Sequence, residues 1–169
     1  ALVPPLHLAN TFFLGSAEEG AAIFAGEKTG YVYSRWGNPT VDVLQARVAA
    51  LENAEAALAT ASGMAAISTA LLNVVRAGDH IVAPRAIYPS TFHLMQNELH
   101  ALGIATTFVD ATDAQNIELA LQPNTKLIYL ESPGNPILAL CDFKAIAKIA
   151  KEAKGAKIIT MTDNTFATP

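Results

Sequence analysis

The segment from Ala61 to Ala66, with the sequence Ala-Ser-Gly-Met-Ala-Ala, joins an apolar run to a run of helical periodicity. A helix that begins directly after a strand presents unpaired backbone N–H groups and the positive end of its dipole. A glycine at that junction lets an anion approach the backbone, so Ser62, Gly63 and Met64 form a candidate phosphate site. An ordinary strand-to-helix turn would have the same residues, and the segment matches neither the Walker A nor the GxGxxG pattern.

Polar residues also follow three further predicted strands. Tyr88 could offer its ring face to a flat ligand and its hydroxyl to proton transfer, although a half-buried surface tyrosine would look the same. Asn135 lies in the segment Glu131–Pro136, where two prolines stiffen the loop, and it could donate a hydrogen bond or belong to a plain turn. Asp163 could form a charge-assisted bond with a protonated ring nitrogen, or it could cap a helix or close an Asp-Asn turn.

The remaining reactive residue types give weaker signals. Arg35, two residues after Tyr33 in a segment rich in glycine, proline and aromatic residues, could bind a phosphate or lie solvated on the surface. Cys141 is the single cysteine, so no internal disulfide is expected, and a buried thiol is favoured over a nucleophile. The histidines show no metal-ligand spacing, so no metal site is predicted; they are His7, His80, His93 and His100.

Alternating helices and strands must position these residues. Hydrophobic periodicity and capping residues predict helices at residues 16–25, 39–51, 63–75, 90–102, 115–121 and 142–153. Short apolar runs predict strands at residues 55–60, 80–83, 105–109, 126–130 and 157–161. Ser16 and Asn38 are the expected N-caps, and Gly103 and Gly155 the expected helix ends. Strands that are apolar on both faces are typical of a parallel sheet covered by helices, which binds ligands at the carboxyl ends of its strands.

Composition excludes several classes of protein. The chain of 169 residues is 51% hydrophobic and 15% charged, which is typical of one globular domain. Its net charge of −4 offers no basic patch for nucleic acid or an anionic membrane. The first residues lack the features of a signal peptide and no apolar run is long enough to span a bilayer, so a cytoplasmic location is expected.

Five segments occur in the order and at the spacing of one enzyme family. They are Tyr33-Ser34-Arg35-Trp36-Gly37-Asn38-Pro39-Thr40, Ala61-Ser62-Gly63-Met64-Ala65-Ala66-Ile67, Ala77-Gly78-Asp79-His80, Glu131-Ser132-Pro133-Gly134-Asn135-Pro136 and Asp163-Asn164-Thr165-Phe166-Ala167-Thr168-Pro169. Along essentially its whole length the chain resembles the Cys/Met-metabolism (trans-sulfuration) family of pyridoxal-phosphate (PLP) enzymes, and within it the methionine γ-lyases.

The resemblance implies an α/β fold of the type I PLP-dependent transferase (aspartate aminotransferase-like) class, with a mostly parallel sheet and helices on both faces. This chain would be its N-terminal part only. Residues 1–40 would form an arm that crosses to a neighbouring subunit, and residues 41–169 would form the first part of the PLP-binding large domain. A homotetramer, built as a dimer of dimers with sites shared between subunits, is the implied assembly.

The family pattern also implies pyridoxal 5'-phosphate as the cofactor and assigns roles to individual residues. Gly63 and Met64, with Ser62, would bind the cofactor phosphate, and Tyr33 and Arg35 would bind the phosphate of the neighbouring subunit's cofactor. Tyr88 would stack on the cofactor ring and assist proton transfer, and Thr165 would pack against the other side of the ring. Asn135 would lie near the phenolic oxygen, and Asp163 would pair with the pyridinium nitrogen. Tyr88 and Asp163 would be the catalytic residues of this chain.

The implied reaction is carbon–sulfur lysis of a sulfur amino acid by γ-elimination, with the cofactor ring as electron sink. O-acetylhomoserine sulfhydrylase and cystathionine γ-synthase or lyase activities are the alternatives. The sequence departs from the family at Pro89, where glycine is usual, and at Ser90, where methionine γ-lyases often carry cysteine. The lysine that links the cofactor and the arginine that binds the substrate carboxylate are expected beyond residue 169.

Two hypotheses from other classes remain. A nucleotide-binding dehydrogenase domain would require GxGxxG after its first strand, which this sequence lacks. A non-catalytic piece would bind the cofactor weakly and turn over no substrate when residues 1–169 are isolated.

Overall fold

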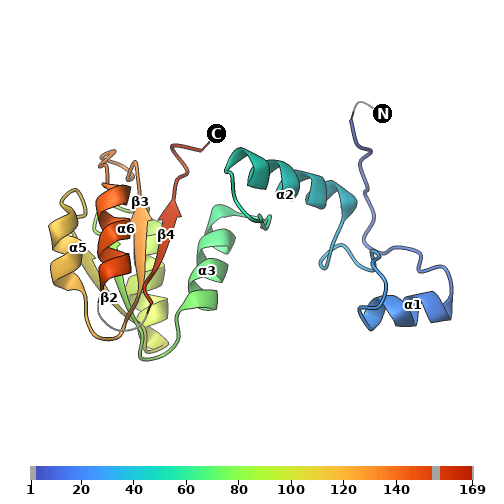
Figure 1. Cartoon of the computed structure of the whole chain (residues 1–169), viewed down its shortest axis with the longest axis horizontal. Coiled ribbons are helices and arrows are strands. Elements are labelled where there is room, and N and C mark those ends of the chain that lie inside the picture. Colours follow the sequence, from blue (N-terminus) through green and yellow to red (C-terminus); the bar gives the residue numbers. More distant parts are fainter. Residues whose placement is uncertain (1–2, 154–156, 169) are drawn as a thin grey trace. The chain divides into compact units, whose positions relative to one another are not determined.

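The computed structural model describes residues 3–153 and 157–168. The chain divides into two compact units, one that ends at Ala59 and one that begins at Thr60. Figure 1 shows the helices and strands of both units along the chain. Each unit is described separately below.

The first unit contains two helices whose starts agree with the predicted caps. Helix α1, Ala17–Phe24, begins after Ser16, whose hydroxyl accepts a hydrogen bond from the Glu19 N–H group at 3.2 Å. Helix α2, Pro39–Leu51, begins after Asn38, whose side chain accepts from the Thr40 N–H group at 2.9 Å. These bonds confirm both predicted N-caps. Such caps can be predicted from sequence because the capping side chain bonds to a backbone N–H group only a few residues later.

The predicted strand at residues 55–60 is wrong. These residues take no strand conformation, and the side chain of Leu58 is 75% exposed. The Ala59 N–H group donates to the side-chain oxygen of Gln45 at 2.9 Å and not to a neighbouring strand. An apolar run becomes a strand only when another strand supplies hydrogen-bond partners, and a run rich in alanine has little intrinsic preference for that conformation.

The second unit contains a parallel sheet. Within the described residues it has four strands in the order β2-β1-β3-β4, and every neighbouring pair is parallel. Their bounds are β1 His80–Pro84, β2 Ala105–Val109, β3 Thr125–Glu131 and β4 Ile159–Asp163. All four carboxyl ends therefore lie at one edge of the sheet, and the predicted strands at these positions are confirmed apart from small shifts in their ends.

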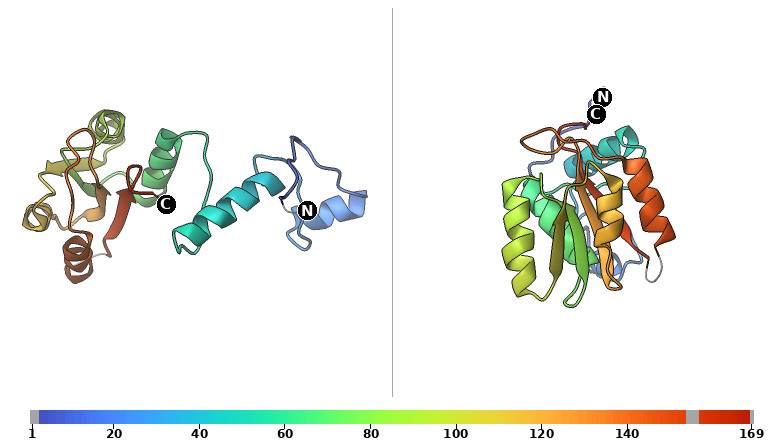
Figure 2. Two further views of the ribbon diagram at one scale, coloured as in Figure 1. Left: turned by 90° about the horizontal axis from the view of Figure 1, so that it is seen from above. Right: turned by 90° about the vertical axis from the view of Figure 1, so that its left-hand side faces the viewer.

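Helices cover both faces of this sheet, as the right-hand view in Figure 2 shows. They are α3 Gly63–Val74, α4 Pro89–His93, the π-helical segment η1 Leu94–Leu99, α5 Ala114–Ala120 and α6 Phe143–Glu152. One core packs α3, α4 and η1 against the side chains of Ile81 and Leu127. The other packs α5 and α6 against Val82 and Ile128. Successive strand residues thus point to opposite faces, and both faces are apolar.

The helix predicted at residues 90–102 is present with one difference. After α4 the turns widen to π-helical geometry in η1 and return to α-helix at His100. Gly103, with a φ of +79°, follows the helix as predicted. Hydrophobic periodicity does not distinguish such a widened turn from an α-helical one. The predicted helix end at Gly155 lies outside the described residues.

A polar cluster lies at the amino end of the sheet. The fully buried His80 ring is held by the hydroxyls of Thr125 and Thr107, each at 2.8 Å, and by the Gln122 amide at 3.2 Å. Burial lowers the pKa of His80 below its ordinary value of 6.5. The cluster joins β1, β2 and β3 at the edge opposite the predicted ligand site. No helix in the described part of the chain is both long and apolar enough to cross a membrane.

Candidate functional site

The carboxyl edge of the sheet borders a cavity of about 530 Å³. Its walls come from the start of α3, the segment after β1, the end and following loop of β3, and the segment after β4. Seven predicted site residues line it, namely Ser62, Gly63, Met64, Tyr88, Asn135, Asp163 and Thr165. Segments up to a hundred residues apart thus meet in one cavity of a size typical for small-molecule sites.

The start of α3 presents donors to this cavity. The Ser62 hydroxyl accepts from the Ala65 N–H group at 3.1 Å, and the Ser62 carbonyl accepts from Ala66 at 3.1 Å. The N–H groups of Gly63 and Met64 have no hydrogen-bond partner among the described residues. A Cβ atom added to Gly63 would meet no atom within 4 Å, so the space in front of the helix is open. Two free donors, the helix dipole and open space together suit an anion.

Asp163 closes another side of the cavity. Its Oδ1 atom accepts from the Thr165 N–H group at 3.0 Å and from the Thr165 hydroxyl at 2.6 Å. These bonds orient the carboxylate and leave Oδ2 able to accept from a further donor. Asp163 therefore forms the local turn that the sequence suggested and still has Oδ2 as an acceptor for a ligand. Its two interpretations, as a turn residue and as a partner for a ring nitrogen, are compatible.

A second Asp-x-Thr turn shows that this local structure alone makes no ligand site. Asp110, directly after β2, accepts from the Thr112 N–H group at 3.1 Å and from the Thr112 hydroxyl at 2.6 Å. These bonds lower the pKa of Asp110. Asp110 does not line the cavity, whereas Asp163 does. The position of the strand in the sheet, and not the turn, distinguishes the two carboxylates.

Tyr129 is buried under this edge of the sheet. Its side chain is 1% exposed, and its hydroxyl has no hydrogen-bond partner among the described residues. Burial raises the pKa of Tyr129, and the negative charge of Asp163 adds to the rise. The phenol therefore stays neutral, and the negative charge in this region belongs to the carboxylates.

Glu131 is a cavity residue to which the sequence assigned no role of its own. It is the last residue of β3, only 5% exposed, and it pairs with Asp163 across the β3–β4 ladder. Its carboxylate accepts from the Tyr88 N–H group and from the Asn135 N–H group, each at 2.7 Å. An acidic residue that ends a long apolar run is the one sequence signal that could have singled it out. The other cavity residues without a predicted role are Ile67, Pro133 and Phe166.

Tyr33 and Arg35 belong to the first unit and are not among the residues that line this cavity. Both side chains are exposed, and the guanidinium carbon of Arg35 lies 5.5 Å from the centre of the Tyr33 ring. None of the residues that line the cavity is lysine or arginine, although two of them, Glu131 and Asp163, are acidic. A cation from another part of the protein would strengthen the binding of a phosphate there.

Cys141 lies beside this region without lining the cavity. Its N–H group donates to the Ser132 hydroxyl at 3.0 Å, and its thiol is half-buried. Burial raises the pKa of the Cys141 thiol. A protonated thiol is a poor nucleophile, in agreement with the structural role predicted for it.

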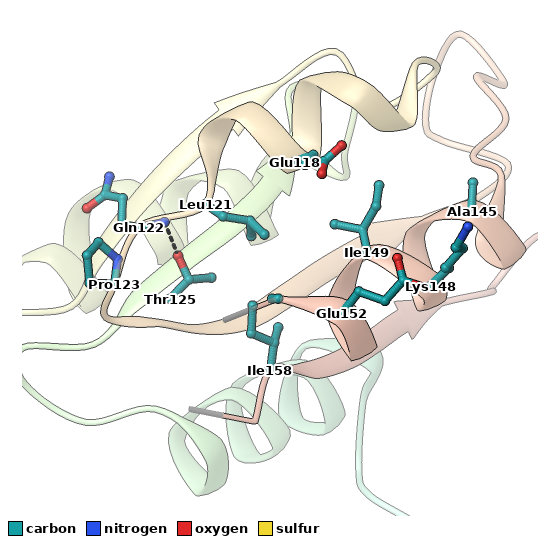
Figure 3. Close-up of a pocket in the computed structure, with 11 residues that line it drawn as sticks. Glu118, Leu121, Gln122, Pro123, Thr125, Ala145, Lys148, Ile149, Glu152 and Ile158 are labelled. Carbon is teal, nitrogen blue, oxygen red and sulfur yellow. Dashed lines mark hydrogen bonds between the residues drawn. The ribbon is translucent and has the colours of Figure 1, made fainter. Parts of the chain in front are cut away.

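A larger cavity, of about 820 Å³, lies at the other edge of the sheet (Figure 3). It is bordered by α5, the turn before β3, α6 and Ile158, and the Gln122 N–H group donates to Thr125 within its wall at 2.7 Å. The side chains of Glu118, Lys148 and Glu152 rim it. It contains none of the predicted site residues, and parallel sheets bind ligands at the opposite edge. Volume alone therefore does not identify the site.

The cavity at the carboxyl edge fits a phosphorylated aromatic ligand with a protonated ring nitrogen. The start of α3 suits its phosphate, Asp163 suits its positive nitrogen, and the Tyr88 ring and Thr165 suit its flat faces. In the described part of the chain, no group of three His, Cys, Asp or Glu residues is placed to hold a metal ion.

Comparisons with known proteins agree with this chemistry. The family described as Cys/Met metabolism PLP-dependent enzyme matches residues 1–169. The L-methionine gamma-lyase of Treponema denticola is 44% identical over 169 residues, which are 100% of this chain and 42% of that protein. The cystathionine gamma-lyase of Bacillus subtilis is 46% identical over 145 residues, which are 86% of this chain and 37% of that protein.

A solved structure with the same fold is that of a putative O-acetylhomoserine (thiol)-lyase from Campylobacter jejuni, which contains N'-pyridoxyl-lysine-5'-monophosphate. It matches with a TM-score of 0.89 and 36% identity, over 100% of this chain and 41% of that chain. The present chain thus spans about two fifths of the length of the proteins that it resembles.

Proposed function

This chain belongs to the Cys/Met metabolism family of PLP-dependent enzymes, and we propose that the whole protein is a carbon–sulfur lyase that acts on sulfur amino acids by γ-elimination. Membership and the structural match confirm the predicted α/β fold of the type I PLP-dependent transferase class, and pyridoxal 5'-phosphate is the cofactor of the family. The observation that carries the proposal is the single cavity in which the start of α3, Tyr88 and Asp163 meet.

In this proposal the chain's own residues bind and orient the cofactor. The N–H groups of Gly63 and Met64 hold the phosphate, because they are the free donors at the start of α3. Oδ2 of Asp163 accepts from the protonated ring nitrogen, while Thr165 fixes the carboxylate through Oδ1. Asn135, which lines the same cavity, would lie near the phenolic oxygen of the bound cofactor. When bound, the cofactor supplies an electron sink for the charge left by removal of the substrate's Cα proton.

Tyr88 is the proton donor that we assign to the departing sulfur. Its backbone N–H group is held by Glu131 at 2.7 Å, and its side chain is 41% exposed at the wall of the cavity. A phenol placed this way can stack on a flat ring and deliver a proton from its hydroxyl. The leaving thiolate takes that proton and departs as a thiol.

The alternative activity is γ-replacement on a homoserine ester, or cleavage or synthesis of cystathionine. The support for it is that a cystathionine gamma-lyase and an O-succinylhomoserine sulfhydrylase are 46% and 43% identical to this chain, over 145 and 164 residues. Ser90, next to Pro89 at the start of α4, stands where methionine γ-lyases often carry cysteine. Assays of the full-length protein with methionine, cystathionine and O-acetylhomoserine in parallel decide between the activities. If methionine reacts fastest and releases a thiol, the result supports the proposed γ-elimination. If cystathionine or O-acetylhomoserine reacts faster, the alternative activity replaces the proposal.

A spectroscopic experiment tests the cofactor site. Full-length protein mixed with PLP should acquire a visible absorption band that borohydride removes. The Asp163→Asn variant should lose on the order of 10²–10³-fold in kcat, the cost of removing one preorganised electrostatic partner. Asp110→Asn, in the matching turn after β2, is the control and should keep wild-type activity. A colourless wild-type protein in excess PLP would contradict the proposal.

We further propose that the protein is a homotetramer, a dimer of dimers, in which residues 1–40 cross to a neighbouring subunit. Support comes from the absence of lysine and arginine in the lining of the cavity and from the exposed Tyr33 and Arg35 in the first unit. Arg35 would add a cation to the phosphate site. The single cysteine and the small amino-acid substrate suit a cytoplasmic enzyme.

A mixed-subunit experiment tests this sharing. Arg35→Ala and Asp163→Asn subunits, each expected to have low activity alone when PLP is limiting, are coexpressed with different affinity tags and purified as mixed oligomers. If Arg35 acts in the neighbouring site, the pair contains one site with both residues intact and regains activity. If Arg35 serves its own subunit, every site carries a defect and no activity returns.

A further inference from the structure

The carboxylate of Glu131 is placed where a charge is costly unless it is satisfied. The side chain is 5% exposed at the end of β3, on the same face as Tyr129 two residues earlier. No salt bridge in the described part of the chain involves it. Its negative charge is instead satisfied by two short backbone hydrogen bonds, one to each oxygen. Such charge-assisted bonds are about twice as strong as neutral ones.

The two bonds join different loops. Oε2 accepts from the N–H group of Tyr88, which lies 43 residues earlier and directly precedes α4. Oε1 accepts from the N–H group of Asn135, four residues later in the loop after β3. Tyr88 makes no side-chain capping bond of its own, and the next residue is Pro89 at the start of α4. The carboxylate therefore also supplies the negative charge that a helix start favours.

Close packing of the same two loops supports this arrangement. A Cβ atom added to Gly134 would lie 2.7 Å from the carbonyl oxygen of Ala86, so only glycine allows the loops to approach this closely. The Gly134 N–H group donates to the Ala139 carbonyl at 2.9 Å, which closes the loop after β3 on itself. The loop is thus a compact body pressed against the segment that carries Tyr88.

Only a carboxylate of this length matches both donors. Glutamine has one acceptor oxygen and would turn an NH₂ group toward the second backbone N–H group. Aspartate keeps two acceptor oxygens but is one methylene shorter. The choice of glutamate over these residues is thus explained by two converging donors and not by an ion pair.

We propose that Glu131 is the positioning residue of the site: its two oxygens hold the Tyr88 and Asn135 backbones at a fixed separation, so that both side chains meet the bound ring together. This inference rests on the proposed function, because it concerns how the same cavity holds the cofactor and substrate. Glu131 itself transfers no proton in this role, in which its two oxygens serve as acceptors for the two backbone donors.

Amide hydrogen exchange of the full-length protein without cofactor gives the first test. In Glu131→Gln at least one of the two peptides that contain Tyr88 and Asn135 should exchange at least about 10-fold faster than in wild type. Glutamine keeps only one acceptor oxygen, and losing a charged hydrogen bond costs about 1.4 kcal/mol or more. Peptides from α5 and α6 should exchange as before. Glu98→Gln, an exposed glutamate on η1, is the matched control and should change neither segment. Unchanged exchange at Tyr88 and Asn135 would overturn the proposal whether or not the enzyme is active.

Kinetics of the PLP-loaded full-length protein gives the second test. Glu131→Gln should lower kcat on the order of 10²-fold, the cost of misplacing a catalytic group by about 1 Å, and Glu131→Asp should recover part of this loss. In the Tyr88→Phe background the same Glu131→Gln change should cost about tenfold less, because the hydroxyl that it positions is already absent. Equal losses in both backgrounds would assign Glu131 a general structural role and refute positioning. An inactive, colourless wild type refutes the proposed function instead, and the exchange experiment still decides whether Glu131 joins the two loops.

Discussion

The two units of the chain differ in how they hide their apolar residues. In the second unit both faces of the sheet are covered, and every buried hydrophobic residue of the described part lies between Leu71 and Ile158. Among the described residues of the first unit, only Gly20 and Asn38 are buried. Eleven of its large apolar side chains, including those on one face of α2, are exposed. They are Val3, Leu6, Leu8, Phe13, Phe24, Trp36, Val41, Leu44, Val48, Leu51 and Leu58.

This difference indicates that the two units bury their apolar residues in different ways. Hydrophobic burial is the main favourable term in folding, and the second unit obtains it from its own residues. The first unit makes capped helices and local hydrogen bonds but leaves its apolar face for another surface. A segment of this kind suits the arm that we propose to cross between subunits.

The largest expected effect compares a leucine from each unit. Leu127→Ala removes a side chain that is 0% exposed and should lower the free energy of unfolding by about 2–5 kcal/mol. Leu51→Ala removes one that is 66% exposed on α2, and its effect in dilute protein should be under about 1 kcal/mol. Urea unfolding of the full-length protein measures both.

Protein concentration sharpens this comparison. If α2 packs against another subunit, the loss caused by Leu51→Ala should grow as the protein concentration rises, whereas the Leu127→Ala loss should stay constant. Equal losses for the two variants at low concentration would remove the proposed difference between the units.

The next effect concerns Arg35, the cation that we propose the first unit adds to the phosphate site. Arg35→Ala should weaken PLP binding by about 10–100-fold, the cost of losing hydrogen bonds to a charged group. Arg47→Ala, an exposed arginine on α2, should bind PLP as wild type does. Titration of the visible absorption band with PLP measures the dissociation constants. If Arg35→Ala binds PLP with wild-type affinity, Arg35 does not bind the phosphate and the second unit binds it alone.

A smaller effect is the pH dependence of the second unit. Because burial lowers the pKa of His80, the unfolded chain binds a proton more readily than the folded one. The free energy of unfolding should therefore fall as the pH drops below about 6.5, by at most about 1.4 kcal/mol per pH unit for this one group. The decrease should end once the pH falls below the lowered pKa of the folded protein.

Substitutions of histidine isolate this contribution. His80→Gln should reduce the slope between neutral pH and pH 5 in urea unfolding, since it removes the titrating group. His100→Gln, an exposed position after η1, should leave the slope as in wild type. A slope that is identical in His80→Gln would assign the pH dependence to other groups.

The smallest effect compares the same capping device in both units. Ser62 and Ser16 each accept from the backbone N–H group three residues later, at 3.1 and 3.2 Å. Ser62→Ala should lower the free energy of unfolding by about 1 kcal/mol, and Ser62→Gly by only a few tenths. Ser16→Ala should change the global transition less, because α1 lies outside the buried core. Larger destabilisation by Ser16→Ala would show that the first unit unfolds together with the second.

Much of the fold was predictable because its signals are local. Capping residues and periodicity set the helices at Ala17–Phe24, Pro39–Leu51 and Gly63–Val74 within a residue. The sequence could not show that residues 55–60 form no strand, because strand formation depends on a partner elsewhere in the chain. Periodicity likewise identified the apolar face of α2 but not that the unit leaves it exposed.

The candidate site was predictable in its residue types and not in its connections. The seven residues that line the cavity stand at strand ends or at a helix start, where parallel sheets place ligands. Nothing in the sequence indicated that Glu131 would bond to Tyr88 across 43 residues. Nothing in the two Asp-x-Thr turns indicated which aspartate faces the cavity.

The sequence by itself determined the family, most of the helices and the four strands whose carboxyl ends border the cavity, since each depends on residue type and short spacing. The tertiary structure alone decided which strand ends share a cavity, which carboxylate binds two backbones, and which apolar face has no cover within its own unit. These features depend on strand order and on contacts between distant segments, and such contacts exist only after the sheet has assembled.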